Sequence, residues 1–545
     1  MVGKTMDLYG LGSLKSKVMV DLRVENRSNP PALQAKILQS PSCKLPVGQV
    51  PVLRLPSIRS SASSIALRFL QNRLGAIVVV SAVLVIPCYW HSRIQAGDLG
   101  SHSYNAWLAH LIHRGQATGL YFASQWNNVV VDWALDGLGN WVGYGAAEKI
   151  VASAAALIFS WGAFAFIAAA TGRAPWDLLP AIAMVTYGWT FQMGFMNYYV
   201  SIGLAFLILA LIWRGGGWDY AIAAAMVPFV FFAHPIGFLW LIGATIYCKL
   251  SDRLTGRFRW MLLPMGFCAV AGVHFYISHQ YRAFDPIRLR AVLFTGWDQL
   301  VLYSHVYRIL GVVIFLAGSA IFVAGALAEW KTREFWQRVR TPLELWIIAV
   351  FGAAMLWEGL SVPKYGMGVT FLPERVTSIT AVLGLCVLGC VRLRRWQVAA
   401  LAGCAAAFFA LLYRDTAVLN RMENETVLLV RQLPPKTRVI ETISPLPGSR
   451  VGAVHVLDRA CIERCYAYSN YEPSTRQFRI RVNPGSTVVV ADAASGLAMR
   501  EGRYAAKPGD LPMFQVYQCD KSDLTKLCLR DLAAGQGTRE ASSQP

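Results

Sequence analysis

Long apolar segments recur from residue 74 to residue 413, and they restrict the chain to a helical membrane fold. Inside a bilayer there is no water to bond free backbone N–H and C=O groups. A segment that spans the bilayer must therefore form these hydrogen bonds internally, as a helix does. The composition agrees, because 55% of the residues are hydrophobic and only 15% are charged. We predict about eleven transmembrane helices, at 74–91, 148–170, 178–193, 195–213, 219–233, 236–250, 260–278, 308–328, 345–361, 376–391 and 396–413.

Positive charge is concentrated in the N-terminal segment and in one set of short loops. Residues 1–73 hold eleven Lys and Arg against three acids, which predicts a basic, disordered cytoplasmic tail. The loops on the same side of the predicted helices hold thirteen further cations, as expected for cytoplasmic loops. This distribution accounts for the net charge of +20 without a nucleic-acid partner, and it leaves residues 414–545 outside the cytoplasm.

Residues 414–545 have the polar composition of a soluble domain large enough for its own core. A helix leading into a strand near 439–440, with strand-like patterns at 478–482 and 487–490, predicts a mixed α/β domain. Four cysteines predict two disulfides and an oxidising compartment, with all three pairings open. They are Cys461, Cys465, Cys519 and Cys528.

The segment after the first predicted span, at the start of a long outer loop (92–147), combines an acid and several histidines with helical periodicity. Its apolar stripe is formed by Tyr104, Trp107, Leu108, Leu111 and Ile112. The opposite face continues from Asp98 and His102 through Asn105 to His113. We expect an amphipathic helix lying in the membrane interface with its aromatic side in lipid. In the alternative interpretation, Asp98 is only a helix cap and the histidines are solvated.

A second amphipathic helix is predicted at about 124–138 in the same loop. Its apolar stripe is formed by Trp126, Val129, Val130 and Trp133. Asp132 and Asp136 lie off this stripe, so we expect them on a solvated face.

Further polar side chains gather near the predicted outer ends of other helices, where ionisable groups are costly to bury and are frequently functional. They are Asn197, Tyr198, His234, Lys364, Glu374 and Arg375. Structural alternatives remain for several of them. Asn197 suits a helix cap, His234 suits a bond to a backbone group freed by Pro235, and Arg375 suits an interface anchor. Their collection on one side of the membrane is the stronger indication of a site.

Four short motifs carry a resemblance to a known superfamily. They are Asp98-Leu99-Gly100-Ser101-His102, Asn197-Tyr198-Tyr199, His234-Pro235 and Leu372-Pro373-Glu374-Arg375. With the predicted architecture, they resemble an uncharacterised bacterial membrane family that is filed near the GT-C glycosyltransferases. The better-known relatives include protein O-mannosyltransferases and lipid A arabinose transferases. Many of them carry a second acid directly after the first, where this chain has Leu99.

The resemblance implies an inverting glycosyltransferase that moves a sugar from a polyprenyl-phosphate donor to a lipid, glycan or protein acceptor. Its location would be the outer face of the bacterial inner membrane. By resemblance, Asp98 is the general base that takes the proton of the acceptor hydroxyl, and His102 orients or tunes it. The leaving lipid phosphate needs a cation, for which Arg375 and then Lys364 are the candidates. The expected substrate contacts are Asn197, Tyr198, His234 and Glu374.

Two other function classes stay open at this point. A transporter or flippase would need charged groups near mid-bilayer, and the predicted spans are nearly free of charge there. A non-catalytic envelope scaffold would leave the face that carries Asp98 without a role. A divalent metal also stays open, with Asp98, His102, His113 and His234 as candidate ligands, although sequence spacing alone does not bring them together.

Overall fold

The computed structural model describes residues 62–213, 215–286, 294–362, 367–452, 455–520 and 522–533. Residues 60–545 form one compact unit, and every contact given below lies within it. The predicted basic tail falls outside the described residues over 1–61, and the candidate cation Lys364 falls outside them as well.

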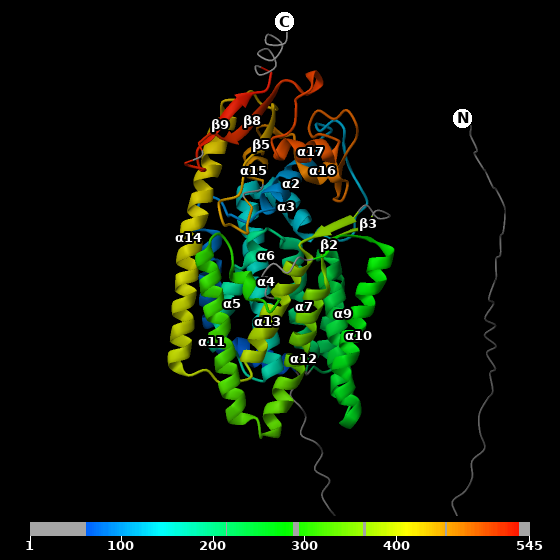
Figure 1. Ribbon diagram of the computed structural model, residues 1–545, viewed down its shortest axis with the longest axis vertical. Coiled ribbons are helices and arrows are strands. Elements are labelled where there is room, and N and C mark those ends of the chain that lie inside the picture. Colours follow the sequence, from blue (N-terminus) through cyan, green and yellow to red (C-terminus); the bar gives the residue numbers. More distant parts are fainter. Residues whose placement is uncertain are drawn as a thin grey trace, which may run out of the picture. The chain divides into compact units, whose positions relative to one another are not determined.

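Helices make up most of the compact unit, and the longest of them run side by side (Figure 1). In chain order they are α1 (Ala62–Val85), α2 (Leu99–His113), α3 (Val130–Val142), α4 (Tyr144–Thr171), α5 (Leu179–Thr186), α6 (Trp189–Gln192), α7 (Met196–Trp213), α8 (Gly217–Ala233), α9 (Pro235–Arg253), α10 (Gly256–Gln280), α11 (His305–Glu329), α12 (Arg333–Met355), α13 (Leu372–Leu388), α14 (Arg395–Arg431), α15 (Val456–Ala460), α16 (Tyr471–Thr475) and α17 (Ala493–Arg500). The predicted spans overlap α1 and α4 to α14, and one of them, 178–193, contains both α5 and α6.

Two predicted spans are clearly displaced. The first is predicted at 74–91, but α1 begins twelve residues earlier, at Ala62, and ends at Val85. Residues 62–73 are therefore helical, and the disordered tail predicted over them is wrong.

The second displaced span is predicted at 345–361, but α12 begins twelve residues earlier in the chain, at Arg333. The Thr332 hydroxyl accepts a hydrogen bond from the backbone N–H of Phe335 and caps that earlier start. After Leu356 the chain turns into a strand that pairs with two others, which ends the helix before the predicted boundary.

Among the residues described, five helices are long and apolar enough to cross a membrane, namely α4, α7, α10, α11 and α14. The chain therefore has the features of a helical membrane protein. α4 and α7 pack at its centre, where a Cβ atom on Gly162 would lie only 2.3 Å from the Gly203 carbonyl oxygen. Small residues allow helix backbones to approach in this way in membrane proteins. By contrast, α10 and α11 expose most of their apolar side chains, which requires an apolar surrounding such as lipid.

The described strands form three small sheets, all in the upper half of Figure 1. β1 (Leu120–Phe122) pairs antiparallel with β7 (Ile480–Val482). β2 (Arg282–Pro286), β3 (Trp357–Val362) and β4 (Met367–Thr370) form an antiparallel sheet. The remaining four described strands form a mixed sheet in the order β6 (Tyr466–Ala467), β5 (Arg438–Thr442), β8 (Met513–Gln518) and β9 (Leu527–Asp531), in which β5 is parallel to both neighbours.

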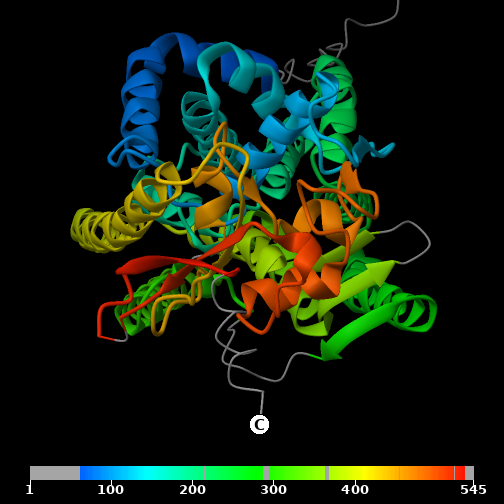
Figure 2. The same ribbon diagram turned by 90° about the horizontal axis from the view of Figure 1, so that it is seen from above.

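The C-terminal region, defined here as residues 432–533, combines β5 to β9 with α15 to α17 and lies across the ends of the helices (Figure 2). α14 leads into it without a break, through the predicted boundary at residue 414. The strand expected at 487–490 is instead an irregular segment with buried valines. The disulfides pair Cys461 with Cys465 and Cys519 with Cys528, which is one of the three pairings left open.

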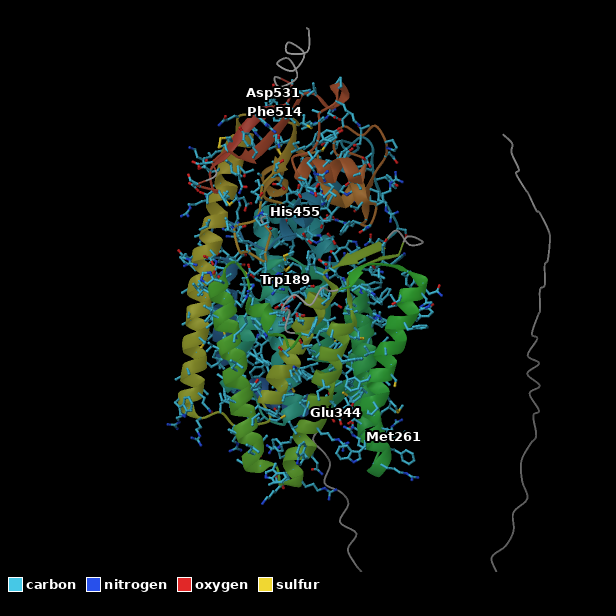
Figure 3. All side chains as sticks on the ribbon, in the orientation of Figure 1. Trp189, Met261, Glu344, His455, Phe514 and Asp531 are labelled. Atoms are coloured by element: carbon cyan, nitrogen blue, oxygen red, sulfur yellow. A yellow bond between two sulfur atoms is a disulfide. The ribbon has the colours of Figure 1, made fainter. Side chains whose placement is uncertain are left out.

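Helix α2 lies inside the compact unit, so the expectation that its aromatic stripe faces lipid is wrong. Tyr104 and Leu108 are fully buried, and the Tyr104 hydroxyl accepts a hydrogen bond from the backbone N–H of Ala467 at 3.0 Å. The Trp107 ring packs against Tyr466. The C-terminal region thus covers the apolar stripe that was assigned to lipid. In Figure 3, His455 lies in the upper part of the molecule, well above Glu344 and Met261.

Candidate functional site

Asp98 is positioned by close backbone contacts between the segment before α2 and the turn between α6 and α7. Its N–H donates to the Met193 carbonyl oxygen at 3.0 Å. Gly194 has a φ of +80°, and a Cβ atom there would lie 2.4 Å from the Ala96 carbonyl oxygen and 2.6 Å from the Asp98 nitrogen. Glycine suits both that conformation and that approach. The Asp98 side chain makes no capping hydrogen bond to α2, so helix capping does not account for this carboxylate.

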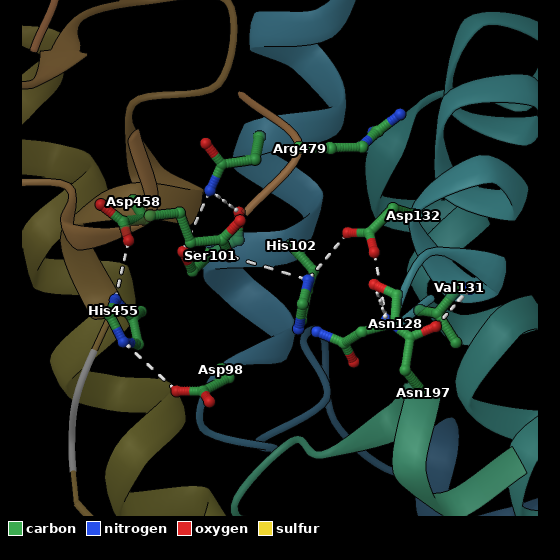
Figure 4. Close-up of polar contacts among 12 residues, drawn as sticks. Asp98, Ser101, His102, Asn128, Val131, Asp132, Asn197, His455, Asp458 and Arg479 are labelled. Atoms are coloured by element: carbon green, nitrogen blue, oxygen red, sulfur yellow. Dashed lines mark hydrogen bonds and ion pairs between the residues drawn. The ribbon is translucent and has the colours of Figure 1, made fainter. Parts of the chain in front are cut away.

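His455, from the C-terminal region, contacts the Asp98 carboxylate (Figure 4). Its Nε2 lies 3.4 Å from Oδ1 of Asp98, and its Nδ1 lies 2.8 Å from Oδ2 of Asp458. Burial opposes protonation of the ring, but the Asp458 and Asp98 carboxylates outweigh this effect and raise the pKa of His455 to about 10. At neutral pH the ring is therefore an imidazolium that donates toward two carboxylates.

His102 belongs to a second ion pair, between α2 and α3. Its Nδ1 lies 2.9 Å from Oδ1 of Asp132 and 3.7 Å from Oε1 of Glu472 on α16. Burial opposes protonation, but Asp132 and Glu472 raise the pKa of His102 to about 9. Despite burial, the positive ring holds the pKa of Asp132 below its ordinary value. The ring thus pairs with Asp132, while Asp98 acts on it only through its charge.

Asn197 supports this pair from α7. Its amide nitrogen donates to Oδ2 of Asp132 at 3.0 Å, and its amide oxygen accepts from the N–H of Val131 at 2.8 Å. The side chain therefore caps the first turn of α3, a helix other than its own. Both of its polar atoms are occupied by protein groups, so its present contribution is to hold Asp132 in place.

The two acids of α3 are not on a solvated face, contrary to the sequence-based expectation. Asp132 is only 5% exposed. Asp136 forms a two-pronged ion pair with Arg479, with Nη1 to Oδ2 at 2.5 Å and Nη2 to Oδ1 at 2.7 Å. The expectation failed because the C-terminal region, which supplies Arg479 and Glu472, covers this side of α3.

Arg375 is positioned by aromatic rings next to the same α6–α7 turn. Its guanidinium carbon lies 3.6 Å from the ring centroid of Phe195 and 5.7 Å from that of Tyr198, and its Nε donates to the Thr370 carbonyl oxygen. The Tyr198 hydroxyl donates to the carbonyl oxygen of Arg375 at 2.6 Å, so this tyrosine holds the arginine backbone. Aromatic rings and a neutral carbonyl oxygen do not cancel the positive charge of the Arg375 guanidinium, so this charge is available to bind an anion.

His234 and Glu374 complete the predicted set. The Nδ1 of His234 accepts from the N–H of Ile236 at 3.2 Å, as the backbone-bonding alternative expects, and its ring meets the Tyr198 ring edge to face. Within the described part of the chain, Oε2 of Glu374 is buried without a hydrogen-bond partner. A buried carboxylate oxygen in that condition is a candidate acceptor for a ligand hydroxyl.

The four candidate metal ligands do not converge. His102 pairs with Asp132, His234 bonds a backbone group, and the exposed ring of His113 packs on Phe122 at 4.9 Å. Over the described residues, no three His, Cys, Asp or Glu side chains form a group that could hold a metal ion.

Sequence reasoning did not single out four residues that complete the site, because they lie in the distant C-terminal region. They are His455, Asp458, Tyr471 and Glu472. One signal was present, since His455 is the only histidine after residue 413. A cavity of about 20 Å³ also borders His455 and Gly97, but its volume has room for only about one water molecule.

Comparisons of this chain with protein-family models, with curated proteins and with solved structures gave no match.

Proposed function

We propose that this chain is an integral membrane glycosyltransferase of the GT-C type. It transfers a sugar from a polyprenyl-phosphate donor to an acceptor hydroxyl at the outer face of the bacterial inner membrane, through about eleven spanning helices with a cytoplasmic N-terminus. Apolar helices of spanning length support the membrane location. Two disulfides in the C-terminal region support an oxidising compartment for the site that this region covers.

The observation that carries the proposal is the joint placement of Asp98 and Arg375 by one turn. The Met193 carbonyl oxygen accepts a hydrogen bond from the backbone N–H of Asp98. Two residues later in the same turn, the Phe195 ring packs against the Arg375 guanidinium. The Asp98 carboxylate acts electrostatically on that guanidinium, so the two groups share one neighbourhood. A base and an anion-binding group held together are the two parts that transfer from a lipid phosphate requires.

The proposed reaction assigns one step to each group. The acceptor oxygen attacks the anomeric carbon while Asp98 takes the hydroxyl proton. The bond from the anomeric carbon to the phosphate oxygen breaks, and its electron pair leaves with the lipid phosphate. Arg375 stabilises the negative charge that develops there. Attack opposite to the leaving group inverts the configuration of the sugar.

Replacement of Asp98 tests the proposal. The full chain is reconstituted in lipid nanodiscs with a panel of polyprenyl-phosphate-linked sugars and a mixture of lipid, glycan and peptide acceptors that carry free hydroxyls. The acceptor-dependent release of polyprenyl phosphate is measured. We expect the wild-type chain to turn over at least one of them, and Asp98→Asn to lower turnover by about 10²- to 10⁴-fold at an unchanged thermal midpoint.

The matched control is Asp252→Asn, because Asp252 is an exposed acid on α9 and should keep wild-type turnover. Full activity of Asp98→Asn would remove Asp98 as the base. Failure of the wild-type chain with the whole panel would count against the transferase itself.

A further inference from the structure

We propose that His455 is a positioning residue for Asp98. Its imidazolium holds one carboxylate oxygen, which turns the other toward the acceptor hydroxyl. The role in transfer rests on the proposed function, whereas the contact between the two side chains stands on the structure alone. No sequence motif pointed to this residue, and it reaches the site from the C-terminal region.

The backbone of His455 is held in an unusual conformation. Its φ and ψ are 73° and 21°, the left-handed region that residues other than glycine rarely adopt. Such residues persist where the surroundings fix them, and they cluster at functional sites. Here the buried Glu441 carboxylate accepts from the N–H groups of His455 and Leu457, at 3.2 and 2.9 Å. Glu441, on β5, thus provides hydrogen-bond acceptors for two free N–H groups at the start of α15. It also fixes the backbone of His455, from which the ring projects.

The helix that follows His455 is fixed at a second point. Arg459, one turn further along α15, donates to Glu423 on α14 at 2.7 and 2.8 Å and to Glu148 on α4 at 3.0 Å. Its guanidinium also donates to the Ile94 carbonyl oxygen, in the segment that leads to Asp98. α15 is therefore tied to the helices and to the segment that carries the acid.

The first turn of α2 packs closely against the backbone of His455. A Cβ atom on Gly100 would lie 3.0 Å from the backbone oxygen of His455, which is tighter than nine in ten real Cβ contacts. A methyl group at Gly100 would therefore shift the His455 backbone slightly, without a change to the Asp98 or His455 side chain itself.

The charges around the ring favour its protonated form. The carboxylates of Asp98, before α2, and Asp458, on α15, face its two nitrogens, and Glu441 approaches from β5. From α16 the Tyr471 ring packs on it, with ring centroids 5.0 Å apart. The Asp98 carboxylate also interacts electrostatically with the Arg375 guanidinium. An imidazolium can donate from both nitrogens at once, whereas a neutral imidazole can donate from only one.

The first test needs no substrate. The full chain, labelled with ¹³C at histidine Cε1 and held in nanodiscs, is titrated by NMR, and the His455 signal is identified by its loss in His455→Gln. We expect that signal to titrate near pH 10 in the wild type. In Asp98→Asn it should titrate about one unit lower or more, because one of the two facing carboxylates is gone. Asp252→Asn serves as the control. An unchanged titration in Asp98→Asn would overturn the proposal.

The second test measures turnover. We expect His455→Gln to lower kcat by about 10²-fold with little change in KM, the cost of a misdirected functional group. Gly100→Ala should give a smaller loss of kcat at a preserved thermal midpoint, and His279→Gln, an exposed histidine on α10, should give none. Wild-type kcat in both His455→Gln and Gly100→Ala would overturn the positioning role. If the NMR shift is found but the wild-type chain turns over no sugar, the proposed function fails and the contact stands.

Discussion

His102 and His455 are buried imidazoliums, and each lies between two carboxylates contributed by different elements. A buried charge without a partner is strongly destabilising, so each ring depends on the carboxylates that face it. The positive ring of His102 in turn holds the pKa of Asp132 below its ordinary value despite burial. For Glu472 the effect of burial is larger than that of the nearby His102 ring, and burial raises the pKa of this acid to about 7. These side chains therefore act as a set, and the loss of one changes the state of the others.

The stability of the His102 pair should depend on pH in a defined direction. The folded pKa of about 9 lies above the ordinary 6.5, so this contribution is fully present below pH 6.5 and is lost as pH rises through 9. The difference corresponds to about 3 kcal/mol at most. We expect the thermal midpoint of the wild-type chain to fall between pH 6.5 and 9.5, and that of His102→Gln to fall less.

A thiol-reactive dye can follow this unfolding, because Cys248 and Cys386 are free and buried in the folded protein. His279→Gln should keep the wild-type slope. Some slope should remain in His102→Gln, since His455 titrates in the same direction. Equal slopes in the wild type and His102→Gln would show that the ion pair with Asp132 does not form.

The turn between α6 and α7 connects the two functional groups, which makes its glycine the most sensitive point of the elements around the site. A methyl group on Gly194 would meet the Ala96 oxygen and the Asp98 nitrogen, and the φ of +80° is unfavourable for alanine. We expect Gly194→Ala to cost about 1–3 kcal/mol of stability and to lower turnover by about 10²-fold. Turnover and thermal midpoint are measured on the same preparation.

Gly145→Ala is the matched control, because Gly145 lies in the first turn of α4 with nothing within 4 Å of a new Cβ atom. Its stability should be unchanged or slightly higher, since alanine suits a helix better. Wild-type turnover in Gly194→Ala would show that the turn does not position Asp98.

The positions of the elements could be largely predicted, whereas the neighbours of α2 could not. Hydrophobic periodicity identifies an apolar face, but lipid and a folded protein surface bury such a face equally well. The stripe through Tyr104 and Trp107 was therefore assigned to lipid, although the C-terminal region covers it. The same reason explains Asp132 and Asp136, whose partners His102 and Arg479 meet them only in the folded chain. Motif positions indicated Asp98 and Arg375, but sequence carries no comparable pattern for a contact with His455.

The compact unit as a whole is closed by contacts between the C-terminal region and the helices. The Arg450 guanidinium donates to the Asp298 carbonyl oxygen at 2.8 Å, and the backbone carbonyl oxygen of Arg450 accepts from the Trp189 indole at 3.1 Å. Arg479 holds Asp136 on α3, and β7 pairs with β1. The region that supplies His455 is thus attached at several points around the candidate site, and we infer that it acts together with the helices and is not a separate binding module.

The most direct test is a cryo-electron microscopy structure of the full chain in nanodiscs with a polyprenyl phosphate. The account predicts phosphate density at the Arg375 guanidinium, on the side that the Asp98 carboxylate faces, with His455 still against that carboxylate. Phosphate density away from Arg375, or an Asp98 side chain turned away from the bound phosphate, would contradict it.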